Sequence, residues 1–149
     1  MSSSQIRGYA TRLMSQEPPQ FSNWKDAWEW HATQEAEAYG QQTEAELLEQ
    51  IRQRQYDPYY QIWYNLRQVG SLATCAPVLL KVLREETGEN MMLVRYHCAA
   101  AIFHLLGYCD DPIPKFRARV QWDHNGEEAR QEAINELEKL IQKRLATPD

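Results

Sequence analysis

Apolar residues recur at helical spacing along most of the chain, and no segment shows the sustained alternation of a β-strand. Ile62, Leu66 and Val69, for example, follow one another at three or four positions, as residues on one face of a helix do. Turn-forming residues separate such segments. We therefore predict an all-α protein with helices near residues 23–39, 44–56, 58–69, 74–87, 91–106 and 127–145.

Capping residues mark the ends of these helices. Thr43 and Glu46 have the spacing of a capping box, in which each side chain accepts the backbone N–H of the other residue. Three further residues are predicted to cap helices, namely Ser22, Asp57 and Asn90. Pro58 suits the first position of the helix after Asp57, because that position needs no N–H. Four glycines are the expected stops: Gly40, Gly70, Gly88 and Gly107.

The chain contains an internal repeat at the spacing of a helix pair. Gly70 and Gly107 end two similar segments and lie 37 residues apart (107 − 70). Laying Val94-Arg95 on Ala129-Arg130 gives a third copy at a shift of 35 residues (129 − 94). A recurrence of this length is typical of stacked helical hairpins.

One copy of the repeat resembles a known family. Ala76-Pro77-x-Leu79-Leu80-x-x-Leu83, then Val94-Arg95, Ala99–Ile102 and Leu106-Gly107, is similar to the HEAT repeats of the lyase-like, phycobiliprotein-associated type. The resemblance covers about residues 43–145, but the third copy has a poor first helix and no Asp lies between Leu83 and Val94. It implies a short right-handed α-α solenoid of about three helix pairs, with the second helices on the inner surface and the Trp-rich helix as an N-terminal cap.

The length of 149 residues suits one domain. The Pro18-Pro19 break divides a predicted flexible arm, residues 1–21, from a single HEAT-like domain at residues 22–149.

Composition and charge exclude several classes of function. The net charge of −5 and the lack of a Lys/Arg run argue against nucleic acid, and the apolar runs are too short for a membrane span. Three cysteines without a CxxC pair, together with the lack of a leader pattern, favour reduced thiols and a cytoplasmic location. No catalytic or cofactor motif occurs, so we expect no enzyme and no cofactor. His97 and His104 are seven residues apart, or about 10 Å along a helix, which is too far for a shared metal ion.

A partner surface is predicted from the aromatic residues and the repeat. Tyr60, Tyr64 and Arg67 form one stripe of the helix after Asp57, and Tyr and Arg are enriched at binding hot spots. The repeat shift places the remaining candidates in register on the later second helices: His97, His104, Glu132 and Lys139. The alternative is that the tyrosines pack on the preceding helix, which carries Trp24, Trp28 and Trp30.

These observations favour a non-catalytic module that binds another protein or a peptide, as an adaptor or assembly factor. Two other roles stay open. The resemblance implies an accessory subunit in phycobilin attachment or phycobilisome turnover. The acidic charge suits an immunity-type inhibitor of a basic toxic enzyme.

Overall fold

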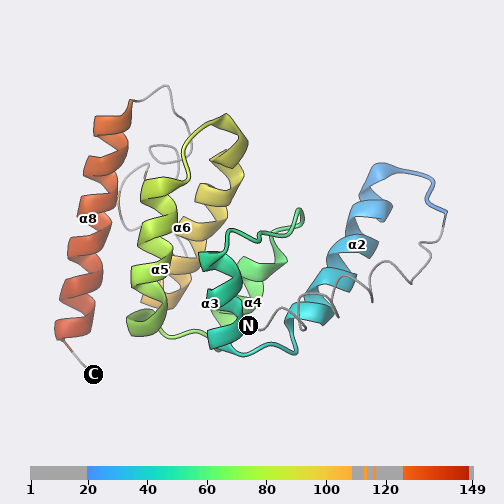
Figure 1. Cartoon of the computed structure of the whole chain (residues 1–149), viewed down its shortest axis with the longest axis horizontal. Coiled ribbons are helices and arrows are strands. Elements are labelled where there is room, and N and C mark those ends of the chain that lie inside the picture. Colours follow the sequence, from blue (N-terminus) through green and yellow to red (C-terminus); the bar gives the residue numbers. More distant parts are fainter. Residues whose placement is uncertain (1–19, 109–112, 114–115, 117–125, 148–149) are drawn as a thin grey trace. The chain divides into compact units, whose positions relative to one another are not determined.

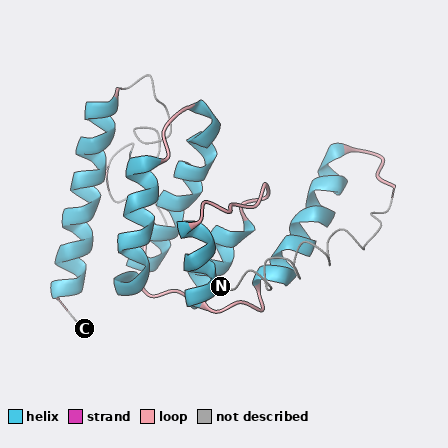
Figure 2. Ribbon diagram, viewed as in Figure 1, coloured by secondary structure: helices cyan, strands magenta, loops and turns pink. Residues whose placement is uncertain are grey.

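The computed structural model describes residues 20–108, 113, 116 and 126–147, and within them it contains helices and no strand (Figures 1 and 2). The chain is therefore all-α, as predicted. It divides into two compact units, residues 1–69 and residues 70–149. The predicted arm lies outside the described residues apart from Gln20 and Phe21.

The described part of unit 1 contains three helices, α2 (Trp24–Tyr39), α3 (Glu44–Arg52) and α4 (Gln61–Val69). Both α2 and α3 pack against α4. Their buried apolar side chains form the core of this unit: Tyr39, Leu47, Leu48, Ile51, Ile62, Trp63 and Leu66.

Side-chain caps begin two of these helices. The capping box of Thr43 and Glu46 is confirmed, with N···O distances of 3.2 and 3.0 Å. The predicted cap of α2 is wrong by one residue, because Asn23 and not Ser22 accepts the N–H of Asp26, at 2.9 Å.

The predicted start of α4 is wrong by three residues. Asp57 does act as a cap, but its carboxylate accepts the N–H groups of Gln61 and Ile62 at 2.9 Å each. The helix therefore begins at Gln61, and Pro58 lies in the turn before it. Val69, which was predicted to lie on the core face, is 47% exposed at the end of the helix.

The described part of unit 2 contains α5 (Leu72–Glu85), a short 3₁₀ turn η1 (Glu89–Met91), α6 (Met92–Leu106) and α8 (Glu127–Ala146). The helix α5 packs against both α6 and α8 (Figure 1). Cys75 and Cys98 are buried free thiols, as predicted, and Cys109 lies outside the described residues.

The predicted N-terminal cap of α6 is wrong, whereas its predicted C-terminal stop is observed. Asn90 does not cap it: the N-terminal boundary residue is Met91, which makes no side-chain cap bond. At the other end Gly107 is the stop, with φ of 91°. The N–H of Tyr108 donates to the Phe103 carbonyl at 2.9 Å, which completes a left-handed C-terminal cap.

Small residues let α6 pack closely on its neighbours. Cys98, Ala99 and Ala101 have no exposed surface, and Leu79, Leu83, Val94 and Ile102 are buried with them. The predicted cluster is confirmed except for Leu105, which is half-buried.

Replacing Ala101 by Phe should overpack this region and lower the free energy of unfolding by about 2 kcal/mol. Thermal unfolding followed by circular dichroism measures the loss, and Ala73→Phe is the control because Ala73 is exposed on α5. Equal melting temperatures for Ala101→Phe and the wild type would contradict close packing at Ala101.

Two buried arginines hold the C-terminal end of α5. Arg95 Nη1 donates to the carbonyl oxygens of Glu86 at 2.8 Å and Gly88 at 2.9 Å. Arg130 donates to the carbonyl of Leu83 and pairs with Glu127 at the start of α8. Carbonyls at a helix end have no partner within the helix, so the two guanidinium groups satisfy the Leu83 and Glu86 carbonyls, which burial would otherwise leave without hydrogen bonds. The repeat shift of 35 residues aligns these two arginines.

Candidate functional site

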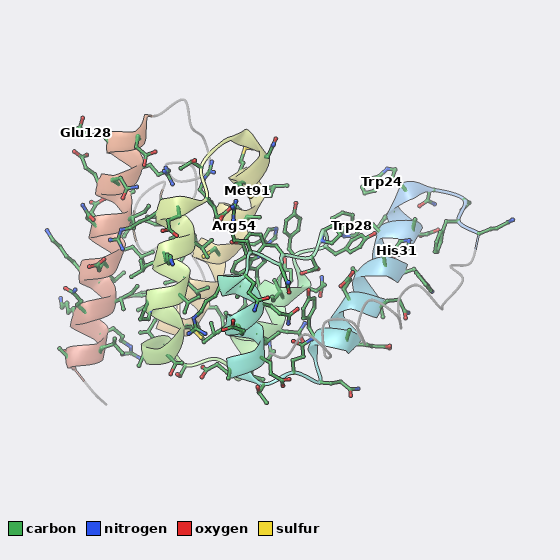
Figure 3. The ribbon with its side chains drawn as sticks, viewed as in Figure 1. Trp24, Trp28, His31, Arg54, Met91 and Glu128 are labelled. Carbon is green, nitrogen blue, oxygen red and sulfur yellow. The ribbon has the colours of Figure 1, made fainter. Side chains whose placement is uncertain are left out.

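An exposed group of aromatic side chains lies on unit 1, and we call it the aromatic patch. It consists of Trp24, Trp28 and His31 on α2 together with Tyr59 and Tyr60 in the turn before α4. Trp24 is 79% exposed and Trp28 is 42% exposed. Figure 3 marks Trp24, Trp28 and His31 along α2.

Ring contacts join α2 to the turn. The Trp28 ring meets Tyr59 edge-on at a centroid distance of 4.7 Å and lies 6.4 Å from Tyr60. The His31 ring stacks on Tyr59 at 5.6 Å with an interplanar angle of 9°. Trp28, His31, Tyr59 and Tyr60 therefore pack together, and Trp24 lies on the same face of α2 one turn before Trp28.

The turn is held by Asp57, whose carboxylate accepts the N–H of Tyr59 at 3.2 Å as well as the two N–H groups at the start of α4. Tyr60 takes a φ of 60°, an uncommon conformation for a residue other than glycine. This conformation reverses the chain immediately before α4. It brings Tyr59 and Tyr60 against Trp28.

Two buried acids lie behind the patch. Glu35 on α2 is 7% exposed, and Asp57 is buried as well. Burial and, to a lesser extent, the charge of Asp57 raise the pKa of Glu35 to about 7. Burial also raises the pKa of Asp57, although its backbone hydrogen bonds lower it in part.

The two acids act on nearby tyrosines. Burial first, and then the charges of Asp57 and Glu35, raise the pKa of Tyr39 well above its usual range. The pKa of Tyr59 is raised by burial and by the same two charges, that of Glu35 before that of Asp57. Tyr59 therefore lies within electrostatic reach of both carboxyl groups and also forms part of the aromatic patch.

The residues predicted for the partner surface take different positions in unit 1. Tyr60 lies in the turn before α4 rather than on a helix, so its predicted place in a helical stripe is wrong. It packs near Trp28, as the alternative interpretation expected. Tyr64 remains 42% exposed on α4, and the Arg67 guanidinium lies over its ring at 4.7 Å.

The other four predicted residues lie in unit 2. On α6, His97 is half-buried with its ring 5.2 Å from that of Tyr96, whereas His104 is exposed. On α8, Glu132 and Lys139 are both exposed. The sequence predicts that these four residues form one continuous face with Tyr64 and Arg67 of α4, and this stays a prediction.

Sequence reasoning missed the buried acids. Asp57 was recognised only as a cap, and Glu35 was not singled out. The signal in the sequence was the position of Glu35, which falls seven residues after Trp28 and four before Tyr39 and so shares a face with both. A carboxyl group on a core-facing stripe is a candidate for a shifted pKa.

A hollow lies in unit 2, between the C-terminal ends of α6 and α8. It has a volume of about 220 Å³ and is lined by Leu106, Tyr108, Leu140, Lys143, Arg144 and Thr147. Its two cations lie in the last turns of α8, where the helix dipole disfavours an anion. We regard it as the weaker candidate.

In the part of the chain that the structure describes, no three His, Cys, Asp or Glu side chains are grouped as metal ligands. The described helices include none that is long and apolar enough to cross a membrane. The fold and the patch define a small all-α protein with an exposed aromatic surface. Comparison of the chain with protein-family models, curated proteins and solved structures found no significant match.

Proposed function

We propose that this chain is a non-catalytic protein-binding module, an adaptor or assembly factor that binds its partner at the aromatic patch. The observation that carries the proposal is the exposure of Trp24 and Trp28, four residues apart on one face of α2. Tryptophan and tyrosine are enriched at interface hot spots, because they bury a large area at a small cost in conformational entropy. Two neighbouring exposed indoles are unusual on a surface that meets only water.

The proposal includes the finer architecture suggested by the sequence, a short HEAT-like α-α solenoid. The consecutive helices α5 and α6 pack together as a helical pair, which supports it. Within this architecture the predicted partner surface extends beyond Tyr60 to Tyr64, Arg67, His97, His104, Glu132 and Lys139.

An immunity-type inhibitor of a basic toxic enzyme is the second candidate. Residues 20–69 contain eight acidic and four basic residues, so the region around the patch is acidic. Charge of this kind speeds association with a basic partner.

Selection from a library of random dodecapeptides tests the binding function and does not require an identified partner. Peptides enriched on the wild type should bind the double variant Trp24→Ala/Trp28→Ala at least about tenfold more weakly, a loss of about 1.4 kcal/mol. Fluorescence anisotropy of the labelled peptides measures the dissociation constants.

Val69→Ala is the matched control, because Val69 is an exposed apolar residue at the end of α4 in the same unit. It should bind the peptides like the wild type. Far-UV circular dichroism confirms that each variant is folded. Enrichment no greater on the wild type than on the double variant would refute the aromatic patch as a binding surface.

A further inference from the structure

One carboxyl oxygen of Glu35 is buried beneath the surface of unit 1. This atom, Oε2, has no hydrogen-bond partner in the described part of the chain, and the side chain is more than nine-tenths buried. Burying a carboxylate without such partners is costly, and native structures seldom leave such an atom unsatisfied. An unsatisfied carboxyl oxygen next to an exposed surface points to a ligand that supplies the donor.

Tyr59 lies near this carboxyl group. Glu35 lies one helical turn after His31, whose ring stacks on Tyr59. The charge of Glu35 acts on Tyr59, which places the two side chains near each other. Tyr59 is half-buried and lies in a turn, and its ring is part of the aromatic patch.

The surroundings of the patch favour a cation. Glu35 and Asp57 both lie behind the patch, and residues 20–69 contain eight acidic and four basic residues. The one basic residue on α2, Lys25, pairs with Glu29 at 3.9 Å. Indole and phenol ring faces attract ammonium and guanidinium groups, so charge and aromatic rings select the same kind of ligand.

We propose that the aromatic patch receives a lysine or arginine side chain of a partner protein, whose charged group displaces the Tyr59 ring and forms an ion pair with Glu35. The inference rests on the proposed function and adds the chemistry of the partner. The incoming N–H groups supply the hydrogen bond that Oε2 lacks. Their positive charge offsets the cost of ionising a buried carboxyl group.

Binding is therefore linked to the ionisation of Glu35. The elements that pack on α2 contribute Asp57, Tyr59 and Tyr60 from the turn and Tyr64 and Arg67 from α4. Of these the Asp57 charge raises the pKa of Glu35, while the Arg67 guanidinium lies over Tyr64. A neutral Glu35 cannot form the ion pair, so affinity rises as the pH increases through the pKa of Glu35, which is about 7.

The test uses peptides enriched on the wild type in the dodecapeptide selection, resynthesised with each Lys replaced by norleucine and each Arg by citrulline. One such replacement should weaken binding to the wild type by about tenfold or more, but binding to Glu35→Gln by less than about threefold. From about pH 5.5 to about pH 8 the wild-type affinity should rise about tenfold, as expected if binding lowers the pKa of Glu35 by one unit. The affinity of Glu35→Gln should stay constant over this range.

Glu37→Gln is the matched control, because Glu37 is an exposed acid on the same helix. It should retain the rise with pH. Glu35→Ala is the second variant and should behave like Glu35→Gln; circular dichroism checks the fold of each.

Two results would overturn the inference and leave the proposed function standing. One is that replacing the basic residue of the peptide weakens its binding to the wild type and to Glu35→Gln by the same factor. The other is selection of peptides that lose affinity with Trp24→Ala/Trp28→Ala but contain no basic residue. Peptides that bind this double variant as tightly as the wild type would refute the proposed function itself.

Discussion

Replacing Arg95 by leucine should lower the free energy of unfolding of unit 2 by about 3 kcal/mol. The substitution keeps an apolar side chain in the core but leaves the carbonyls of Glu86 and Gly88 without the guanidinium donor. A buried acceptor that loses its hydrogen bond costs about 1–3 kcal/mol, and this applies to the Glu86 carbonyl, whereas the exposed Gly88 carbonyl keeps the N–H of Met91 at 3.1 Å. The shorter leucine also loses packing that the fully buried arginine provides. Urea denaturation followed by far-UV circular dichroism measures the change.

Arg84→Leu is the matched control for Arg95→Leu. Arg84 is half-buried and pairs with Glu138 and Asn135 near the surface, so its loss should cost less than about 1 kcal/mol. Arg130→Leu should resemble Arg95→Leu, because Arg130 donates to the Leu83 carbonyl at the same end of α5. Equal stability of the Arg95 and Arg84 variants would show that the buried guanidinium does not hold the end of α5.

Helix positions could be predicted from the sequence because periodicity and caps act locally. The helices predicted at 23–39 and 127–145 are observed at Trp24–Tyr39 and Glu127–Ala146. The error at Asp57 has a local cause as well. Its carboxylate accepts N–H groups four and five residues along the chain, so a turn precedes α4, and a Pro at the first helical position was the wrong expectation.

The packing of the helices could not be predicted in the same way. The helix α6 is apolar on nearly all sides, which correctly indicates burial but does not identify its neighbours. In unit 2 the helix that packs against both others is α5, whose sequence has a distinct polar side. Which helices meet depends on long-range contacts rather than on periodicity.

The candidate site was predictable only in part. The importance of the Tyr-rich segment after Tyr56 was visible, and so was its possible contact with the Trp-rich helix. The exposure of Trp24 was not, because periodicity assigns a tryptophan at helical spacing to the core. The proximity of the two buried acids could not be predicted from the sequence for a different reason. Glu35 and Asp57 are 22 residues apart in sequence (57 − 35), and the electrostatic effect of one on the other depends on the fold.

Raising the pH from about 4.5 to about 8 should destabilise unit 1 by about 3 kcal/mol through Glu35. The pKa of Glu35 is about 7 in the folded chain, whereas the ordinary value for an exposed glutamate is 4.5. Between these values the folded state holds a proton that the unfolded state has released. The stabilisation is therefore complete below about pH 4.5, falls as the pH rises, and is lost above about pH 7. The pKa of Glu35 is about 2.5 higher in the folded than in the unfolded chain, which corresponds to about 3 kcal/mol.

Four of the five tryptophans lie in unit 1, so urea denaturation followed by tryptophan fluorescence reports mainly on this unit. Glu35→Gln stays neutral at every pH and should lose this fall in stability between about pH 5 and about pH 8. The raised pKa of Asp57 acts in the same direction and remains in the variant, so a smaller fall at the acidic end is expected. Glu37→Gln should keep the full dependence, because Glu37 is exposed. Glu35→Gln and the wild type could instead lose stability in parallel as the pH rises. In that case Glu35 does not hold the proton, and the acid that titrates near neutrality behind the aromatic patch is another group.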